Sequence, residues 1–149
     1  MKKLLIAASA AAICATGALA GGHAPIKIGI ILGYTGPIES LTPSMADAAE
    51  LAMEEVTNSE MLLGGKAVEG IRGDSTCIDA AAATTVAERQ ITGDGVSAIM
   101  GADCSGVTGA ILSNVALPNG VVMISPSATS PALSTAEDNG LFFRTAPSD

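Results

Sequence analysis

The sequence predicts an α/β protein with a parallel sheet flanked by helices, and three observations support this fold class. Short apolar runs alternate with segments of helical periodicity over residues 26–149. The runs are rich in isoleucine and valine, as expected for strands that are buried on both faces. Glycine-containing loops separate several of the runs from the helical segments beside them. Strands and helices that alternate in this way are typical of βαβ units with right-handed crossovers.

The first predicted strand, residues 26–32 (IKIGIIL), leads through a glycine-containing loop into a helix. We expect this helix to begin at Ser44, because Asp47 three residues later completes the pattern of a capping box. Its buried face is predicted from apolar residues at helical spacing, which are Met45, Ala48, Ala49, Ala52 and Val56. Gly64 and Gly65 then break the chain before the second strand.

The second predicted strand covers about residues 67–73. Asp79 caps the helix that follows, and Gly93 and Gly95 end it. The apolar residues of this helix again recur at helical spacing; they are Ala80, Ala83, Ala87 and Ile91.

Three further strands are predicted in the second half of the chain, at residues 96–100, 121–125 and 141–145. A third helix, about residues 105–117, separates the first two of them, and a short turn or helix precedes the last. The sequence stops at Asp149, directly after a strand that no helix covers. We therefore expect it to be part of a longer protein.

The N-terminus has the pattern of a secretory signal peptide. Lys2 and Lys3 precede an apolar run, and residues 18–20 (ALA) supply a small-x-small cleavage site. A membrane anchor is the alternative, which the shortness and alanine-richness of the run disfavour. We expect residues 1–20 to be removed and residues 21–25 to form a linker. With no lipid-anchor signal evident, the expected location is the periplasm of a Gram-negative bacterium.

Charge and composition exclude several classes of partner. Residues 1–20 contain two lysines and no acidic residue, so their removal lowers the net charge from −8 to −10. The mature chain has no basic patch, which argues against nucleic acid and anionic membranes as partners. Tyr34, Phe142 and Phe143 are the aromatic residues, and tryptophan is absent. A binding site built on aromatic stacking is therefore not expected.

The mature part keeps two cysteines, Cys77 and Cys104. An even count in an oxidising compartment is most simply explained by one disulfide, which would stabilise the fold by about 3–4 kcal/mol. The alternative is a hydrolase with Cys104 as nucleophile before a helix. However, the flanking ADCSG lacks the first glycine of a nucleophile elbow, and the single histidine, His23, lies in a predicted tail. We therefore expect neither catalysis nor a metal site, and no cofactor.

A ligand site is expected where the loops after the third and fourth strands meet. In open α/β sheets, ligands bind beyond the carboxyl ends of the strands. Ser105 and Gly106 begin the third helix, whose free N–H groups favour a carboxylate or phosphate. The other loop, SPSATSP, gathers four hydroxyl groups from Ser125, Ser127, Thr129 and Ser130. We expect small polar residues and no titratable side chain between the loops, as suits a small zwitterion or anion. Alternatively, Ser105 only caps its helix and both segments are ordinary surface loops.

At these residues the sequence resembles a known family. The segments IKIGIILGYTGP, AAELAMEEVTNS, GDSTCID, DGVSAIMGADCSGVT, VVMISPSATSPALS and FFRTAPSD are similar to those of the periplasmic substrate-binding proteins of ABC transporters. The type is the leucine/isoleucine/valine-binding, type I family. The resemblance covers residues 26–149, and MISPSATSP and CSG are its most specific parts.

The resemblance implies a two-lobed protein that closes on an amino acid, with residues 26–149 as a truncated N-terminal lobe. Ser105 would bind the ligand α-carboxylate through its hydroxyl and backbone N–H. Thr129 would contact both the carboxylate and the ammonium, and Ser127 or Ala128 would offer a carbonyl to the ammonium. Leu41 would contact the ligand side chain; relatives can carry a bulky aromatic there, which leaves the side-chain preference open. A second lobe would supply the carboxylate that pairs with the ammonium.

The implied function is capture of a branched-chain or other aliphatic amino acid and its delivery to the membrane permease of an ABC transporter. The protein would be a monomer and not an enzyme, and Cys77 and Cys104 match the family's disulfide. Two alternatives remain open. One is a ligand-binding sensor domain of the same fold, followed by a transmembrane helix. The other is a small amide or organic acid as the ligand.

Overall fold

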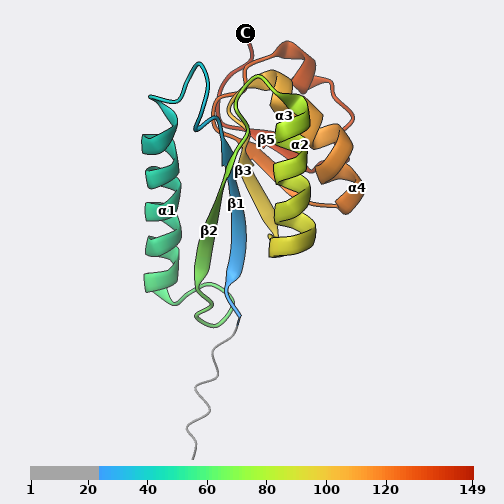
Figure 1. Ribbon diagram of the computed structural model, residues 1–149. Helices are drawn as coiled ribbons and strands as arrows, with labels where there is room; N and C mark the ends of the chain where they lie inside the picture. Colours follow the sequence, from blue (N-terminus) through green and yellow to red (C-terminus); the bar gives the residue numbers. More distant parts are fainter. Residues whose placement is uncertain (1–23) are drawn as a thin grey trace, which may run out of the picture.

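The computed structural model describes residues 24–149 as a five-stranded parallel sheet with helices on both faces (Figure 1). The strands are β1 (Ile26–Leu32), β2 (Val68–Asp74), β3 (Ala98–Gly101), β4 (Val122–Ser125) and β5 (Phe142–Arg144). The α-helices are α1 (Thr42–Ser59), α2 (Ala80–Arg89), α3 (Ser105–Ile111) and α4 (Leu117–Asn119). This confirms the predicted fold class. The predicted signal peptide, residues 1–20, and the start of the linker lie outside the described residues.

Short irregular helical segments extend two of the α-helices. A π-helical segment, η1 (Gln90–Asp94), continues α2, and another, η2 (Leu112–Ala116), joins α3 to α4. The predicted third helix is thus one helical stretch with a π-helical middle. The carboxylate of Asp79 accepts hydrogen bonds from the N–H groups of Ala81 and Ala82, which confirms Asp79 as the cap of α2. Gly95 ends η1 in the left-handed conformation, as predicted, but Gly93 lies within η1 and does not end the helix.

Helix α1 begins two residues earlier than predicted. Its first residue is Thr42, and Leu41 occupies the cap position without a side-chain hydrogen bond to the helix. The predicted capping box of Ser44 and Asp47 is therefore wrong. Pro43 lies in the first turn, where the N–H that proline lacks would have had no helical partner. The Thr42 hydroxyl donates to the Gly33 carbonyl oxygen at 3.1 Å, a tertiary contact that holds the start of the helix in place.

The buried face of α1 also differs from the predicted one. Ala46 is fully buried and packs with Ile30 and Leu32 of β1. Three of the five predicted face residues are instead exposed: Ala48, Ala52 and Val56. Ala52 and Val56 line an apolar hollow together with Met100 of β3 and Ile124 of β4, because α1 packs over β1 and β2 and not over these two strands.

The strand order β2-β1-β3-β4-β5 places a topological switch point between β1 and β3. The chain leaves β1 toward one side of the sheet and leaves β3 toward the other, so their loops diverge at this edge (Figure 1). Gly101 ends β3 with φ of 137°, and a Cβ there would lie 2.1 Å from the Ile31 carbonyl oxygen. This position therefore requires glycine. It turns the chain directly into the loop predicted to bind ligand.

Candidate functional site

A hollow of about 400 Å³ lies at the switch point, between the loops that follow β1, β3 and β4. Residues from all three loops and from the start of α1 line it: Ile38, Leu41, Met45, Asp103, Cys104, Ser105, Ser127 and Thr129. The lining is apolar where the loop after β1 and the start of α1 contribute Ile38, Leu41 and Met45, and the loops after β3 and β4 contribute hydroxyl-bearing residues. This division suits a ligand with one apolar and one polar end.

A disulfide joins Cys77, after β2, to Cys104, which lines the hollow before α3. The Cα atoms of the two cysteines are 5.2 Å apart. The bridge confirms the predicted pairing, and it removes the free thiol on which the hydrolase alternative depended. It also ties the loop before α2 to the start of α3. Ser105, the first residue of α3, is thereby anchored on its N-terminal side.

Asp103 is the residue around which these loops are organised. It is 3% exposed, and its carboxylate accepts hydrogen bonds from the Gly33 N–H at 2.7 Å and the Cys104 N–H at 2.9 Å. The Ser75 hydroxyl approaches the same carboxylate at 3.4 Å. The donors come from the ends of β1 and β2 and from the start of α3. One buried carboxylate thus links three loops and satisfies donors that would otherwise be costly to bury.

The loop after β4 is held to the loop after β3 through hydroxyl groups. Ser125, fully buried at the end of β4, donates its hydroxyl to the Ala102 carbonyl and accepts the Ala128 N–H at 3.0 Å. Ser127 donates its hydroxyl to the Asp103 carbonyl oxygen at 3.0 Å. These bonds fix the spacing between the two loops. The hollow between them is consequently preformed in this structure.

Two further residues that line the hollow, Ser105 and Thr129, carry hydroxyl groups. The Ser105 hydroxyl oxygen accepts the Ser130 N–H at 3.1 Å, which leaves its own proton available for a ligand oxygen. The Thr129 hydroxyl donates to the Asp149 carboxylate at 2.7 Å. Behind the loop, the Arg144 guanidinium donates to the carbonyl oxygens of Ala128 and Ser130, at 3.3 and 2.9 Å. Arg144 therefore stabilises the loop that carries Thr129.

The structure brings four of the six predicted ligand residues to this hollow: Leu41, Ser105, Ser127 and Thr129. Ala128 and Gly106 are not among its lining residues. The Ala128 side chain is fully buried beneath the loop, and Gly106 is exposed one residue into α3.

The expectation that no titratable side chain lies between the loops is wrong, because Asp103 lines the hollow. Sequence reasoning also missed Ile38 and Met45. An acidic residue directly before Cys104 was visible, but its donors are 70 and 28 residues away along the chain. Nothing local to the sequence indicated that Gly33 and Ser75 would converge on Asp103.

Asp74, at the end of β2, belongs to the neighbouring loop. Its carboxylate accepts the Thr35 hydroxyl at 2.6 Å and the Thr76 N–H at 2.8 Å. Burial favours the neutral acid, but the hydrogen bonds from Thr35, Thr76 and Tyr34 outweigh it and hold the pKa of Asp74 below its usual value. Asp74 therefore holds the loop after β1 from outside the hollow.

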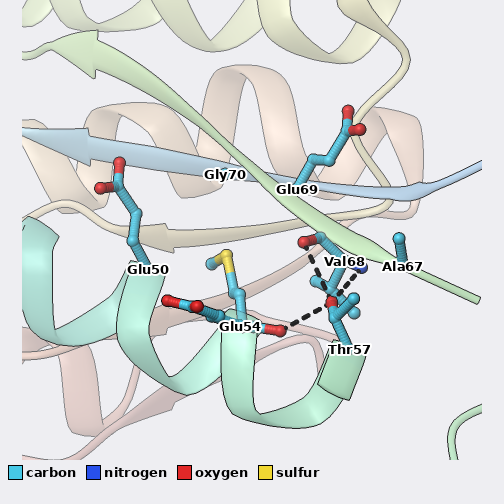
Figure 2. A pocket seen from close by; sticks show the side chains of 8 residues that line it. Glu50, Glu54, Thr57, Ala67, Val68, Glu69 and Gly70 are labelled. Atoms are coloured by element: carbon cyan, nitrogen blue, oxygen red, sulfur yellow. Dashed lines mark hydrogen bonds between the residues drawn. The ribbon is translucent and has the colours of Figure 1, made fainter. Parts of the chain in front are cut away.

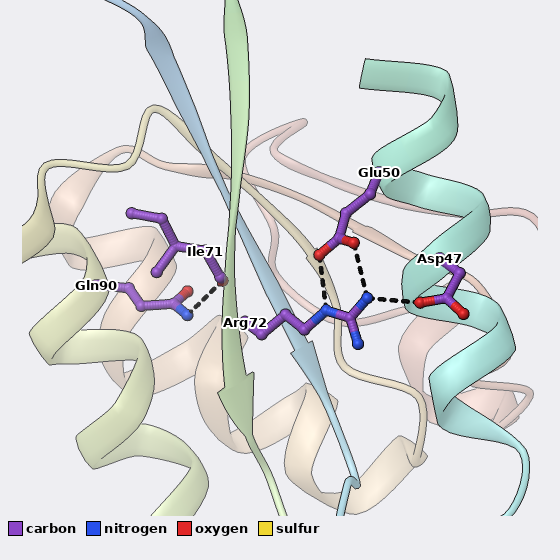
Figure 3. Close-up of polar contacts among 5 residues, drawn as sticks. All are labelled: Asp47, Glu50, Ile71, Arg72 and Gln90. Atoms are coloured by element: carbon purple, nitrogen blue, oxygen red, sulfur yellow. Dashed lines mark hydrogen bonds and ion pairs between the residues drawn. The ribbon is translucent and has the colours of Figure 1, made fainter. Parts of the chain in front are cut away.

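A charged cluster on the other side of β2 has no part in the candidate site. Figure 3 shows Arg72 between Asp47 and Glu50 of α1, while Gln90 approaches β2 from the opposite side and donates to the Ile71 carbonyl. The hydrogen bond from Arg72 is the main cause that lowers the pKa of Glu50. The Tyr34 ring lies beside Arg72, and burial raises its pKa to about 12. These contacts attach α1 to the edge of the sheet.

A second hollow, of about 490 Å³, lies between α1 and the edge strand β2 (Figure 2). Three carboxylates border it, from Glu50, Glu54 and Glu69, and the Thr57 hydroxyl joins α1 to β2 by accepting the Val68 N–H at 2.9 Å. The hollow is open and far from the carboxyl ends of the strands. The expected site does not fall here. Within residues 24–149, no cluster of histidine, cysteine and acidic side chains is placed to hold a metal ion.

None of the helices described in residues 24–149 has the length and apolar character needed to cross a bilayer.

The sequence profile of the periplasmic binding protein family matches residues 25–149. The Leu/Ile/Val-binding protein homolog 3 of Brucella melitensis biotype 1 is 33% identical over 142 residues, which cover 95% of this chain and 37% of that protein.

Solved structures are similar over the same region. The branched-chain amino acid transporter substrate binding protein LivJ from Streptococcus pneumoniae, in complex with isoleucine, has a TM-score of 0.73 and 31% identity, covering 83% of this chain and 34% of that one. A solute binding protein from Rhodopseudomonas palustris BisB5, in complex with 3,4-dihydroxybenzoic acid, shares the fold with a TM-score of 0.70 and 22% identity, covering 83% and 32% of the two chains. The chain thus spans about one third of the length of these relatives.

Proposed function

Because this chain belongs to the periplasmic binding protein family, we propose that it captures an amino acid with an aliphatic side chain for an ABC transporter. The relatives are solute-binding proteins rather than enzymes. The bound amino acid would be handed to a membrane permease. The working location would be the periplasm, which the protein would reach through residues 1–20 as a cleaved export signal.

The observation that carries this proposal is the division of the hollow at the switch point. Ser105 and Thr129 contribute hydroxyl groups to its lining, and Ile38, Leu41 and Met45 contribute aliphatic side chains. Backbone N–H and hydroxyl donors stabilise a carboxylate without a buried cation. The apolar part of the lining favours an aliphatic side chain through the burial of its surface. An α-amino acid with a branched aliphatic side chain meets both requirements.

In the proposed complex, the Ser105 hydroxyl and N–H bind the ligand carboxylate. Thr129 turns its hydroxyl from Asp149 to the ligand, and a carbonyl of Ser127 or Ala128 accepts from the ammonium. Leu41 contacts the ligand side chain. Residues 26–149 would form the N-terminal lobe of a two-lobed protein whose second lobe completes the site. A ligand that contacts both lobes when they are closed shifts the population toward the closed state.

Two other roles use the same hollow. A small organic acid is a specific alternative, since the 3,4-dihydroxybenzoic acid complex from Rhodopseudomonas palustris shares this fold. Among the described residues that line the hollow none is aromatic, so this part of the site offers no ring to stack on such a ligand. A sensor domain of the same fold would bind a similar ligand, and it would be joined to a transmembrane helix and a signalling domain instead of acting with a permease.

A thermal-shift screen of the complete protein against aliphatic amino acids, small amides and organic acids tests the proposal. A ligand at 100 times its Kd stabilises the native state by about 2.7 kcal/mol, which is a readily measured increase in Tm. We expect the increase with leucine, isoleucine or valine, and its loss in Ser105→Ala. Ser59→Ala, at the far end of α1, is the control and should respond to ligand like the wild type. An unchanged Tm with every compound would overturn the proposal.

A further inference from the structure

The sequence contains two Asn-Gly pairs, Asn119-Gly120 and Asn139-Gly140, which the structure places in different surroundings. In such a pair the glycine nitrogen can attack the side-chain amide carbon of the asparagine, because glycine has no side chain to hinder the approach. We propose that Asn139 is a site of spontaneous deamidation and that the Asp138 carboxylate assists the reaction as its base. This turn precedes β5, at the edge of the sheet opposite the hollow between the loops.

Asn139 and Gly140 form a tight turn that leads into β5. Both residues have positive φ, 51° and 74°, and the Leu141 N–H donates to the Asp138 carbonyl oxygen at 2.8 Å across the turn. Asn139 and Gly140 are exposed, and a Cβ on Gly140 would meet no atom of the described chain within 4 Å. Water can therefore reach the turn, and the surroundings of the attacking nitrogen are open.

The Asp138 carboxylate lies against the attacking nitrogen. One of its oxygens accepts the Gly140 N–H at 2.8 Å. A side chain at this distance can remove the proton as a general base. As the Gly140 nitrogen bonds to Cγ of Asn139, its proton passes to Asp138, and the Cγ–Nδ2 bond then breaks. Nδ2 takes up that proton and leaves as ammonia. The cyclic imide that remains needs only water to open.

The imide can open in two ways. Addition of water at Cγ gives aspartate at position 139, and addition at the backbone carbonyl carbon gives isoaspartate, whose main chain runs through Cγ. Both products carry a new negative charge in place of the neutral amide. Isoaspartate also lengthens the main chain directly before Leu141, whose carbonyl oxygen accepts the Met123 N–H at 2.8 Å. This product would therefore loosen the start of β5.

Asn119-Gly120 is a matched pair in the same chain. Asn119 ends helix α4, and its Nδ2 donates to the Val115 carbonyl oxygen at 2.7 Å. The Gly120 N–H donates to the Leu117 carbonyl oxygen at 3.1 Å, and a neutral carbonyl is a much weaker base than a carboxylate. The helix thus holds both the leaving amide and the attacking nitrogen. We expect Asn119 to react more slowly than Asn139.

The test measures both sites in one sample. The complete protein is incubated in its folded state near neutral pH and is then digested in acid, where deamidation is slow. Mass spectrometry of the peptides that contain Asn119 and Asn139 follows the loss of each amide, and chromatography separates aspartate from isoaspartate. We expect Asn139 to react at least tenfold faster, a difference of about 1.4 kcal/mol in activation free energy. In urea the two rates should converge, because the fold no longer distinguishes the two pairs.

Two variants separate the base from the turn. Asp138→Ser keeps a side-chain oxygen that can accept the Gly140 N–H but removes the carboxylate. It should slow the reaction at Asn139 by roughly threefold or more and leave the rate at Asn119 unchanged. Glu137→Ser removes the adjacent, exposed carboxylate and is the matched control, so both rates should stay at the wild-type values.

The rate at Asn119 also reports whether a variant is folded, because it should rise when α4 unfolds. If it rises in Asp138→Ser, Asp138→Asn takes the place of that variant, since it keeps an acceptor of the same size without the base. Equal rates at the two asparagines of the folded wild type, or a faster reaction at Asn119, would overturn Asn139 as the modification site. If Asn139 is faster but the Asp138 and Glu137 variants alter its rate equally, the role of Asp138 is wrong.

Discussion

The two faces of the sheet differ in how completely they are covered. On the face toward α2 and α3, sixteen buried residues form one continuous core that includes Ile99, Ile111 and Met123. On the face toward α1, the corresponding cluster has three fully buried residues, Ile30, Leu32 and Ala46. In Figure 1, α1 stands alone on its side, whereas α2, α3 and α4 lie on the other. Stability of the described region should therefore come mainly from one face.

The covered face is also where the site loops are fixed. The disulfide joins the loop before α2 to the start of α3, and Asp103 adds hydrogen bonds from Gly33 and Ser75. The α1 face is held at its outer edge by exposed ion pairs of Arg72. The face toward α2 and α3 thus has a large buried core and a covalent bond, whereas the α1 face has a small buried cluster and solvent-screened charges. Similar substitutions on the two faces should therefore lower the free energy of unfolding by different amounts.

The largest expected effect comes from the disulfide. Replacing both Cys77 and Cys104 by alanine should lower the free energy of unfolding by about 3–4 kcal/mol, because the cross-link restricts a 27-residue loop in the unfolded chain. Urea denaturation monitored by circular dichroism measures it. A reducing agent should destabilise the wild type by a similar amount and leave the double variant unaffected. A loss below about 1 kcal/mol would contradict the importance given to this link.

A matched pair of methionines tests the two faces directly. Met123 of β4 is fully buried against α2 and α3, and Met100 of the adjacent strand β3 is half-buried on the other face. Met123→Ala should cost about 3 kcal/mol through lost burial and the cavity left behind. Met100→Ala should cost roughly 1 kcal/mol, because less apolar surface is lost. Urea denaturation measures the free energy of unfolding of both variants. Equal losses of stability would show that the α1 face contributes as much as the covered one.

Sequence reasoning succeeded where the signal was local and failed where it was tertiary. The bounds of β1 and the Asp79 cap were predicted correctly, because hydrophobic patterning and capping act within a few residues. The start of α1 was misplaced because the contact that holds it, from Thr42 to Gly33, depends on the folded loop. The rule that ligands bind beyond the carboxyl ends of parallel strands led to Ser105, which lines the hollow. The same rule gave no sign that Asp103 links the loops, because its hydrogen-bond donors come from three separate elements.

Acid should weaken the α1 face through Glu50. Its pKa is lowered by the hydrogen bond from Arg72, so the unfolded chain takes up a proton at a higher pH than the folded protein does. The stability from this pair is therefore present above the ordinary glutamate pKa of 4.5 and is lost as the pH falls through the lower, folded value.

Glu50→Gln should lower the free energy of unfolding at pH 7 by less than about 1 kcal/mol, since the pair is exposed. Urea denaturation from pH 7 to pH 3 measures the difference from the wild type, which should shrink as the pH falls and also in high salt. Glu55→Gln, on the exposed part of α1, is the control. A difference that grows toward low pH would contradict the sign derived for Glu50.

The smallest effect on stability is expected from the uncovered strands. Met100, Ile124 and Phe143 lie in register across β3, β4 and β5 on the α1 face, and Ile124 and Phe143 are 41% and 54% exposed. Ile124→Thr should change the free energy of unfolding by no more than about 0.5 kcal/mol, because little burial is lost.

The Ile124→Thr substitution should also reduce the fluorescence of a dye that binds exposed apolar surface, such as 8-anilinonaphthalene-1-sulfonate. Leu51→Thr, an exposed change on α1 outside the hollow, is the control and should alter the fluorescence less. A large loss of stability in Ile124→Thr would mean that this face is covered in the protein, and the contrast between the two faces would then be withdrawn.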